Sequence, residues 1–262
     1  MKICLLSSGS IGNAIVVEGN EISLLIDCGI SFKKMEELLL QSGLEKEKVK
    51  HLLVTHEHAD HAKGVGVCAR KLNLDVWSTE KTIDKLYEKG IIKSDNVRVN
   101  SLEKYKNYEI GEFKITPFSL SHDATDPIGF VIESNDKKIV ILTDTGYVSK
   151  DVMKKINNAD VYVMEVNHNV EMLHMCDRPW QLKQRILSDF GHLSNEEAAY
   201  VLSEVIGERT KDIFIAHISQ EANLPELALM TVKDVLKERN INIGKLNFHM
   251  TYPLMYSNVV VV

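Results

Sequence analysis

The segment Thr55-His56-Glu57-His58-Ala59-Asp60-His61 places three histidines and an aspartate within six positions, in the pattern H-x-H-x-D-H. It follows the apolar run 52–54, which predicts a strand, and it precedes a helical pattern at residues 65–72. A packing role is unfavourable because burying so many unpaired polar groups costs free energy. Imidazole and carboxylate groups at a strand end are instead typical of a site for divalent metal ions.

The composition is that of an ordinary globular protein. The chain has 262 residues, of which 44% are hydrophobic and 26% are charged, and this length allows a substantial core. No linker or low-complexity segment interrupts it, so we expect one continuous domain over residues 1–262. The net charge of −6 argues against wholesale binding to polyanions, although it is compatible with a local basic patch.

The sequence predicts a cytoplasmic protein without a membrane partner. No apolar run approaches the roughly 18 residues that a membrane span needs, and the first apolar run is too short for a signal peptide. The four cysteines are widely separated and form no C-x-x-C pair. We therefore expect reduced thiols rather than a zinc knuckle or a disulfide framework.

Hydrophobic periodicity predicts a chain in which strands and helices are interspersed. Strands are expected at residues 3–6, 14–18, 23–26, 52–54, 76–78, 113–118, 129–132, 139–142, 161–164, 213–216, 245–248 and 259–262. Helices are expected at 32–41, 62–72, 82–89, 149–156, 195–206 and 225–238, with Ser194 and Glu197 as a capping pair for the fifth. This order favours two sheets packed face to face with helices outside.

Polar residues follow four other predicted strands: His122, Asp144, Glu165 with His168 three positions later, and His217. A single histidine in such a place is more often a hydrogen-bonded structural residue. Together with the H-x-H-x-D-H segment, however, these residues are better explained as one metal centre built on strand termini.

The order H-x-H-x-D-H, then His, Asp and His, resembles the metallo-β-lactamase superfamily. Its YycJ/WalJ-type branch resembles this chain at residues 8–13 (S-G-S-I-G-N), 143–149, 165–168, 178–180 and 191–196, and the similarity runs nearly the whole length. The resemblance implies a four-layer αββα sandwich, two divalent metal ions and phosphodiester hydrolysis, as a 5′-exonuclease acting on DNA.

The resemblance also implies a ligand set. One ion would be held by His56, His58 and His122, the second by Asp60, His61 and His217, and Asp144 would bridge them. Imidazoles and carboxylates without a thiolate fit zinc, manganese or iron. The β-lactamases proper have cysteine or serine at the position of Asp144, so aspartate favours a symmetric two-metal site for a phosphodiester.

Differences between this chain and other branches of the superfamily reduce the number of activities to be expected. Flavo-diiron reductases have a glutamate where this chain has His58, and no flavodoxin-like domain follows, so we expect no flavin. The tRNA 3′-processing nucleases carry a protruding arm that has no counterpart here. The large two-domain nucleases need an inserted domain for which this chain is too short.

Roles in proton transfer are assigned on the same resemblance. Asp60 would orient the attacking oxygen, and His192, held by Glu165, would protonate the leaving oxygen. The alternative for His192 is a structural hydrogen bond just before the helix that Ser194 begins.

Substrate contacts are expected in two loops. Ser8, Ser10 and Asn13 lie in a Gly-rich loop whose backbone could approach a phosphate, and the alternative is a plain tight turn. His168 would line the substrate channel or cap the turn after Glu165.

A basic segment offers further contacts. Arg178, Lys183 and Arg185 would contact phosphates or form a solvated face. For Trp180 we expect a place in the core rather than stacking on a base.

Two other functions stay open on the sequence alone. The nearest is the same chemistry on RNA or on a small or cyclic phosphodiester. The other is a non-catalytic metal-binding protein that acts through partners, which the complete ligand set disfavours. The oligomeric state is open as well.

Overall fold

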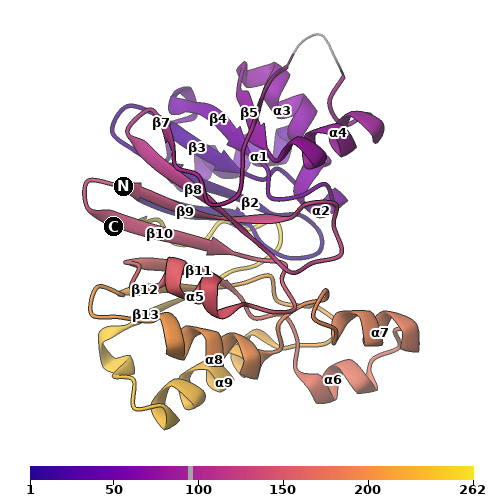
Figure 1. Ribbon diagram of the computed structural model, residues 1–262, viewed down its shortest axis with the longest axis vertical. Coiled ribbons are helices and arrows are strands. Elements are labelled where there is room, and N and C mark those ends of the chain that lie inside the picture. Colours follow the sequence, from indigo (N-terminus) through magenta and orange to yellow (C-terminus); the bar gives the residue numbers. More distant parts are fainter. Residues whose placement is uncertain (94–96) are drawn as a thin grey trace.

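A computed structural model describes residues 1–93 and 97–262 as two seven-stranded sheets packed face to face between outer helices (Figure 1). The first sheet has the order β14 (Val260–Val261), β1 (Lys2–Ser7), β2 (Ala14–Glu18), β3 (Ser23–Ile26), β4 (Val49–Leu53), β5 (Asp75–Ser78) and β6 (Arg98–Ser101). The second has the order β13 (Asn247–Met250), β12 (Asp212–Ala216), β11 (Val161–Glu165), β10 (Lys137–Leu142), β9 (Ile128–Ser134), β8 (Phe113–Ser119) and β7 (Tyr108–Ile110). The predicted αββα sandwich is confirmed.

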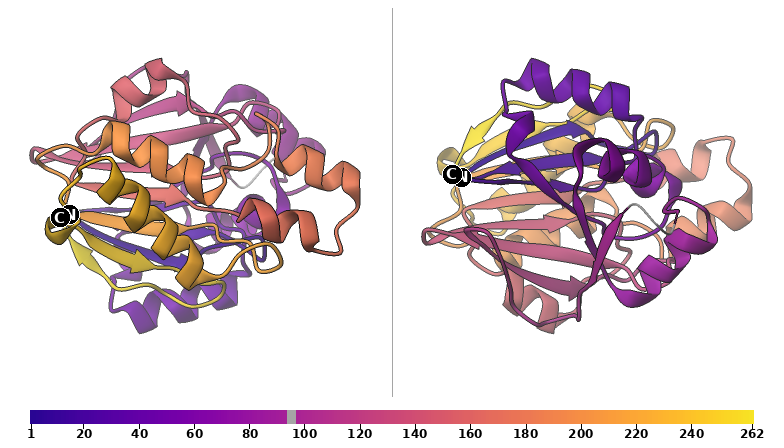
Figure 2. Two further views of the ribbon diagram at one scale, coloured as in Figure 1. Left: turned by 90° about the horizontal axis from the view of Figure 1, so that it is seen from below. Right: turned by 90° about the horizontal axis from the view of Figure 1, so that it is seen from above.

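Helices cover the outer face of each sheet. Beside the first sheet lie α1 (Phe32–Ser42), α2 (Ala59–Ala62), α3 (Val65–Leu72) and α4 (Glu80–Glu88). Beside the second lie α5 (Lys150–Ile156), α8 (Asn195–Val205) and α9 (Pro225–Glu238). Two short helices, α6 (Val170–Met175) and α7 (Trp180–Ile186), project from one end of the sandwich, as both views of Figure 2 show.

Three apolar layers hold these elements together. The layer between the sheets contains residues of both, such as Leu24 and Phe130, and the other two pack each sheet against its helices. Strand β11 illustrates the pattern, because Val163 faces the other sheet whereas Tyr162 and Met164 face α5 and α8. A strand buried on both faces is continuously apolar, which is why strands of this kind were readily predicted.

Parallel pairing brings several strand ends to one edge. Strands β3 and β4 are parallel, as are β10, β11 and β12. Helix α2 and the pair α6–α7 lie at this same edge (Figure 1). The loops that follow the parallel strands therefore meet there, at the place where α/β sheets usually carry their sites.

Several predicted boundaries differ from the observed ones. The expected helix 62–72 is two helices, because Gly64 packs against the loop after β3, where a Cβ at this position would lie 2.2 Å from the carbonyl oxygen of Ile30. Strands β6 and β7 and helices α6 and α7 were not predicted; they are short and lie at edges, where hydrophobic periodicity is weak. The expected strand 245–248 begins at Asn247.

Two expectations about the chain as a whole can be compared with the structure. In the described ranges, every helix is too short or too polar to cross a bilayer. Cys4, Cys28, Cys68 and Cys176 are free thiols, as predicted.

Candidate metal centre and active site

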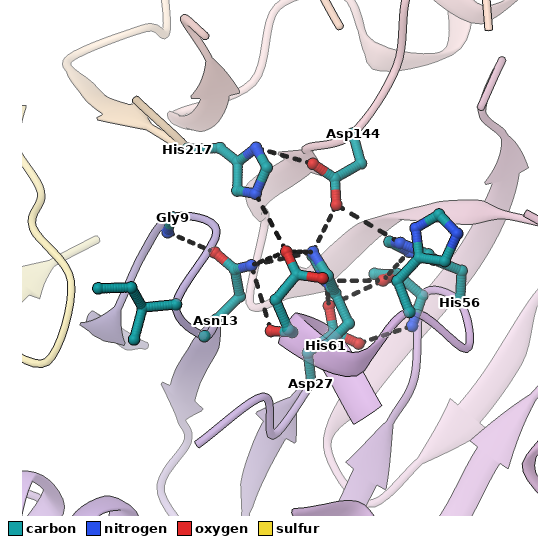
Figure 3. A network of polar contacts seen from close by, with 12 residues as sticks. Gly9, Asn13, Asp27, His56, His61, Asp144 and His217 are labelled. Atoms are coloured by element: carbon teal, nitrogen blue, oxygen red, sulfur yellow. Dashed lines mark hydrogen bonds and ion pairs between the residues drawn. The ribbon is translucent and has the colours of Figure 1, made fainter. Parts of the chain in front are cut away.

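The seven side chains predicted as metal ligands converge at this edge of the sandwich. Figure 3 labels His56, His61, Asp144 and His217 among them. One group comprises His56, His58 and His122, and a second comprises Asp60, His61, Asp144 and His217. Within each group, one donor atom per residue lies within 4.8 Å of the others. Residues from four separate loops thus form one polar cluster.

The H-x-H-x-D-H segment turns sharply after β4. His58 precedes α2 in an extended conformation, and Asp60 and His61 occupy that short helix. Backbone bonds anchor the helix: the carbonyl of Asp60 accepts from the N–H of Asn13 at 2.7 Å, and that of His61 from the N–H of Cys28 at 2.8 Å. The segment is therefore held by the loops after β1 and β3.

For two of the ligand histidines, His61 and His122, hydrogen bonds also fix which ring nitrogen faces the cluster. His61 donates from Nδ1 to Oδ2 of Asp27 at 2.7 Å, and His122 donates from Nδ1 to the carbonyl of Gly191 at 3.0 Å. Asp27 is itself held by the N–H and the hydroxyl of Thr55, both at 2.8 Å. Such partners behind a ligand orient the ring and raise its basicity.

The backbone at three site residues is left-handed. Asp27, Asp144 and His217 have φ values of 58°, 57° and 53°. Each costs of order 1–3 kcal/mol and persists only where the surroundings enforce it. For His217 the enforcement is visible, since its N–H donates to Oγ of Ser8 at 2.8 Å and its carbonyl accepts from Nδ2 of Asn167 at 2.9 Å.

The ionisable groups buried in the cluster shift one another's pKa values. Burial opposes ionisation of Asp144, but the neighbouring His217 and His61 outweigh it and hold the pKa of Asp144 well below its ordinary value. Conversely, burial lowers the pKa values of His61 and His217, yet nearby carboxylates, Asp144 first, raise both. Burial holds the pKa of His56 well below its ordinary value. The carboxylates thus stabilise positive charge in a buried site.

The residues present fit a divalent metal ion. Nε2 of His56 and Nε2 of His217 are buried and have no hydrogen-bond partner among the described residues. Nδ1 of His58 and Nε2 of His122 face each other at 3.3 Å. Buried nitrogens without partners are rare in native proteins, and a set of imidazoles and carboxylates binds divalent ions.

The predicted pair of Glu165 and His192 lies beside the cluster. Nδ1 of His192 is 2.6 Å from Oε1 of Glu165, whose Oε2 accepts from the N–H of Thr145 at 2.9 Å. Burial opposes ionisation of Glu165, but His192 outweighs it and lowers the pKa of this carboxyl. These two residues also form a third group of potential ligand atoms with Asp144 and His217.

An open cavity of about 530 Å³ lies over the cluster. His58, Asp60, Asp144 and His192 are part of its lining, and residues of the α6–α7 segment form a wall. A cavity lined by members of both candidate metal groups and by His192 can bind and hydrolyse a ligand with an anionic reacting group.

The expected substrate contacts divide into two sets. Ser10, Arg178 and Arg185 line the cavity. Ser8 and Asn13 instead lie buried behind the ligands, where Ser8 bonds His217 and Nδ2 of Asn13 lies 2.9 Å from Nε2 of His61. The Gly-rich loop thus positions ligands with these two side chains, and only Ser10 faces the cavity.

His168 is a second departure from the expected contacts. Its side chain is buried and outside the cavity lining, and burial lowers its pKa to about 4. Its carbonyl accepts from the N–H of Asn195 at 2.9 Å, so its backbone supports the start of α8.

The basic segment at α7 differs from the prediction in two positions. Trp180, expected in the core, is 57% exposed and stacks on His174 with ring centroids 5.9 Å apart. Lys183 is buried and donates to the carbonyl of His174 at 2.7 Å. The reason is that α7 is a short edge helix whose inward face carries Lys183 and Ile186.

Two ion pairs tie this segment to the ligand loops. Nε of Arg178 lies 2.8 Å from Glu221, which follows His217 in the chain, and Nη2 of Arg185 lies 2.9 Å from Asp123, next to His122. Neither acidic partner was predicted, and neither was Asp27. For Asp27 a signal existed, because it directly follows the predicted strand 23–26.

Comparisons with known proteins agree with this geometry. A family model described as a Beta-lactamase superfamily domain matches residues 23–217. The chain is 42% identical over 261 residues to Exodeoxyribonuclease YycJ of Bacillus anthracis, which covers 99% of this chain and 98% of that protein. It is also 42% identical to Exodeoxyribonuclease WalJ of Streptococcus pneumoniae, with 93% and 91% covered. The crystal structure of the metallo-beta-lactamase fold protein YhfI from Bacillus subtilis superposes with a TM-score of 0.74 at 17% identity, covering 97% of both chains.

Proposed function

The chain belongs to the metallo-β-lactamase superfamily, and on that premise we propose that it is a metal-dependent exodeoxyribonuclease that hydrolyses DNA from its 5′ end. The observation that carries the proposal is the 42% identity to Exodeoxyribonuclease YycJ over nearly the full length of both chains. The convergence of all seven candidate ligands beneath an open cavity supports it.

Two divalent ions are part of the proposal. His56, His58 and His122 would hold one, and Asp60, His61 and His217 would hold the other, with Asp144 shared between them. Zinc, manganese and iron all suit these donors. When bound, such ions neutralise charge on the phosphate oxygens and lower the pKa of the attacking water.

We assign Asp60 the role of orienting the attacking water. Its Oδ2 lies 3.6 Å from Nε2 of His61 and 3.5 Å from Nε2 of His217, and the side chain lines the cavity. A carboxylate accepts hydrogen bonds only, so Asp60 aligns a water whose lone pair then points toward phosphorus.

We assign His192 the role of protonating the leaving oxygen. Nδ1 of His192 is hydrogen-bonded to Glu165. Nε2 is therefore the ring position that can donate toward the cavity. The buried carboxylate holds the ring in one orientation. A positioned acid of this kind contributes typically about 10²–10⁴-fold to the rate.

Arg178 and Arg185 complete the site as phosphate contacts. Both line the cavity, and both are already paired with a carboxylate, Glu221 and Asp123 respectively. A guanidinium binds phosphate in the same two-pronged geometry as carboxylate. DNA phosphates would therefore compete with those carboxylates for the two arginines.

The test uses the purified protein with Mn²⁺ or Zn²⁺ and end-labelled linear DNA, single- and double-stranded, beside matched RNA and a closed circular DNA. We expect nucleotides to be released from 5′ ends of linear DNA while the circle stays intact. A chelator should stop the reaction, metal should restore it, and Asp144→Ala should be inactive. Cleavage of RNA alone, or of the circle, would contradict the proposal.

A further inference from the structure

A second pocket lies on the other side of the H-x-H-x-D-H segment from the catalytic cavity. Its volume is about 440 Å³, and its charged lining residues are Glu57, Lys63, Arg70, Lys89 and Lys93. Four cations against one carboxylate give a local charge of +3 in a chain whose net charge is −6. We call this site the α2–α4 basic pocket.

This pocket and the catalytic cavity share one segment of chain. Glu57 and Ala59 line the basic pocket, whereas His58 and Asp60 line the cavity. Neighbouring residues at the start of α2 thus line the two sites. In Figure 1, α2 and α4 lie toward the same edge of the sandwich as α6–α7, so an extended ligand can reach both sites.

Among the residues that the structure describes, no acidic side chain forms an ion pair with the cations of this pocket. Lys63 donates to the carbonyl of Ile11 at 2.8 Å, and Lys89 donates to the carbonyl of Glu57 at 3.0 Å. Within residues 1–93 and 97–262, neither lysine forms an ion pair, and neither does Arg70. By contrast, Lys85 and Lys106 each pair with a glutamate three residues away.

One oxygen of the pocket's carboxylate is engaged elsewhere. Oε1 of Glu57 accepts from the N–H and the hydroxyl of Thr125, at 3.0 and 2.6 Å. Glu57 therefore anchors the segment to the loop before β9. Lys63, Arg70 and Lys89, which form no ion pair with any described residue, stay open to an anion.

We propose that the α2–α4 basic pocket binds backbone phosphates of the DNA whose end occupies the catalytic cavity. The inference rests on the proposed function and names a second contact for the same substrate. Each strand of duplex DNA carries a phosphate roughly every 3.4 Å along the axis, so several phosphates lie near any end held in the cavity. Contacts of this type add affinity without reading sequence.

The test compares Lys63→Ala/Arg70→Ala with a charge-matched control, Arg239→Ala/Lys245→Ala, at the end of α9 on the outer side of the second sheet. DNA binding is measured by fluorescence anisotropy at several salt concentrations, and KM and kcat are measured on linear DNA. Each lost phosphate contact lowers the slope of log K against log salt by about 1. We expect a fall of about 2 for the pocket variant, a rise in KM, and no change for the control.

A conservative replacement of Arg70 distinguishes an effect of its positive charge from an effect on the structure. Arg70→Lys should retain most of the salt dependence, because it retains the positive charge, while Arg70→Ala should lose about one contact. Equal losses in the pocket variant and the control would overturn the proposal. So would a pocket variant that loses binding of inorganic phosphate but keeps the wild-type slope on DNA.

Failure of this inference is distinguishable from failure of the proposed function. If wild-type protein cleaves linear DNA and the pocket variant retains the full salt slope, only the second contact is wrong. If wild-type protein with metal cleaves no DNA, the exodeoxyribonuclease proposal itself fails.

Discussion

The carboxylate of Asp27 accepts a hydrogen bond from Nδ1 of His61 at 2.7 Å, and so directs Nε2 of that ring into the candidate metal centre. The same carboxylate is held by Thr55, one residue before the H-x-H-x-D-H segment. A residue outside the ligand set therefore links the loop after β3 to the loop after β4 and orients a ligand between them (Figure 3).

Replacing Asp27 with alanine should weaken metal binding. The His61 ring loses the partner that fixes its orientation, and such partners are worth about 10–100-fold in metal affinity or activity. Titration calorimetry with Mn²⁺ or Zn²⁺, together with metal content after dialysis, measures the change.

Asp212 provides a matched control, because it lies at the end of β12 that is away from the ligand loops. Asp212 holds Nε2 of His249 at 2.8 Å, far along the sheet from the ligand loops. Asp212→Ala removes an equivalent bond, and we expect it to leave metal affinity unchanged. If Asp27→Ala binds metal as wild type does, the orienting role assigned to Asp27 is wrong.

The ligand cluster could be predicted because its signal is local. Each ligand is a histidine or an aspartate placed just after a buried apolar strand, and parallel strands carry such positions to a common edge. Asp27 obeys the same rule, yet an isolated aspartate after a strand carries no motif. It becomes significant only when packing places it against His61.

The α6–α7 wall could not be predicted, for a different reason. Helical periodicity shows that one face of a helix is apolar but not what that face contacts. In α7, the inward face carries Lys183 and Ile186 and leaves Trp180 exposed. Partners that lie far away in the sequence, such as Glu221 for Arg178, are equally invisible to local patterns.

Replacing His192 with alanine should lower kcat by about 10²–10⁴-fold while metal content stays that of wild type. The reason is that His192 supplies a proton to the leaving oxygen and is not in the proposed ligand set. A substrate with a good leaving group, such as thymidine 5′-p-nitrophenyl phosphate, needs less help from an acid. The variant should therefore retain far more of its activity on that substrate than on DNA.

Glu165→Gln provides the comparison for this prediction. Glutamine keeps the size of the side chain but removes the charge beside His192, so we expect a smaller loss with the same dependence on leaving group. Loss of metal from His192→Ala would instead identify His192 as a ligand, in the third group with Asp144, Glu165 and His217.

Asp160 should stabilise the fold in a way that depends on pH. Its carboxylate accepts from the N–H of Lys138 at 2.9 Å and from Arg209 at 2.6 Å. Burial opposes ionisation, but these bonds outweigh it and lower the pKa of Asp160. A lowered folded-state pKa means that the stabilisation is fully present above the ordinary value of about 4 and is lost as the pH falls through the folded-state value.

Asp160→Asn should therefore reduce the free energy of unfolding by about 1–3 kcal/mol at pH 7, and by less near pH 3. Urea unfolding at both pH values measures this. Asp151→Asn is the control, because Asp151 forms an exposed pair with Lys154, and exposed pairs contribute about 0–1 kcal/mol. An equal loss at both pH values would show that the charge of Asp160 is not the source.

Replacing Gly29 with alanine should disrupt the candidate metal centre without touching a ligand side chain. A Cβ at this position would lie 1.5 Å from the carbonyl oxygen of Asp60, so the α2 helix with Asp60 and His61 must move. Its N–H also donates to the carbonyl of Asn13 at 2.7 Å, which prevents the loop after β3 from moving away. We expect a loss of roughly 3 kcal/mol or more in stability and a large loss of metal affinity.

Gly43→Ala separates this clash from the general effect of removing a glycine. Gly43 ends α1 in the left-handed region, with φ of 75°, and an added Cβ meets nothing within 4 Å. Its cost should be only the backbone strain of about 1–2 kcal/mol, with wild-type metal affinity. Thermal unfolding and metal titration of the two variants distinguish these outcomes. If Gly29→Ala bound metal with wild-type affinity, the H-x-H-x-D-H segment would tolerate displacement. That result would contradict the prediction drawn from the close packing between Gly29 and Asp60.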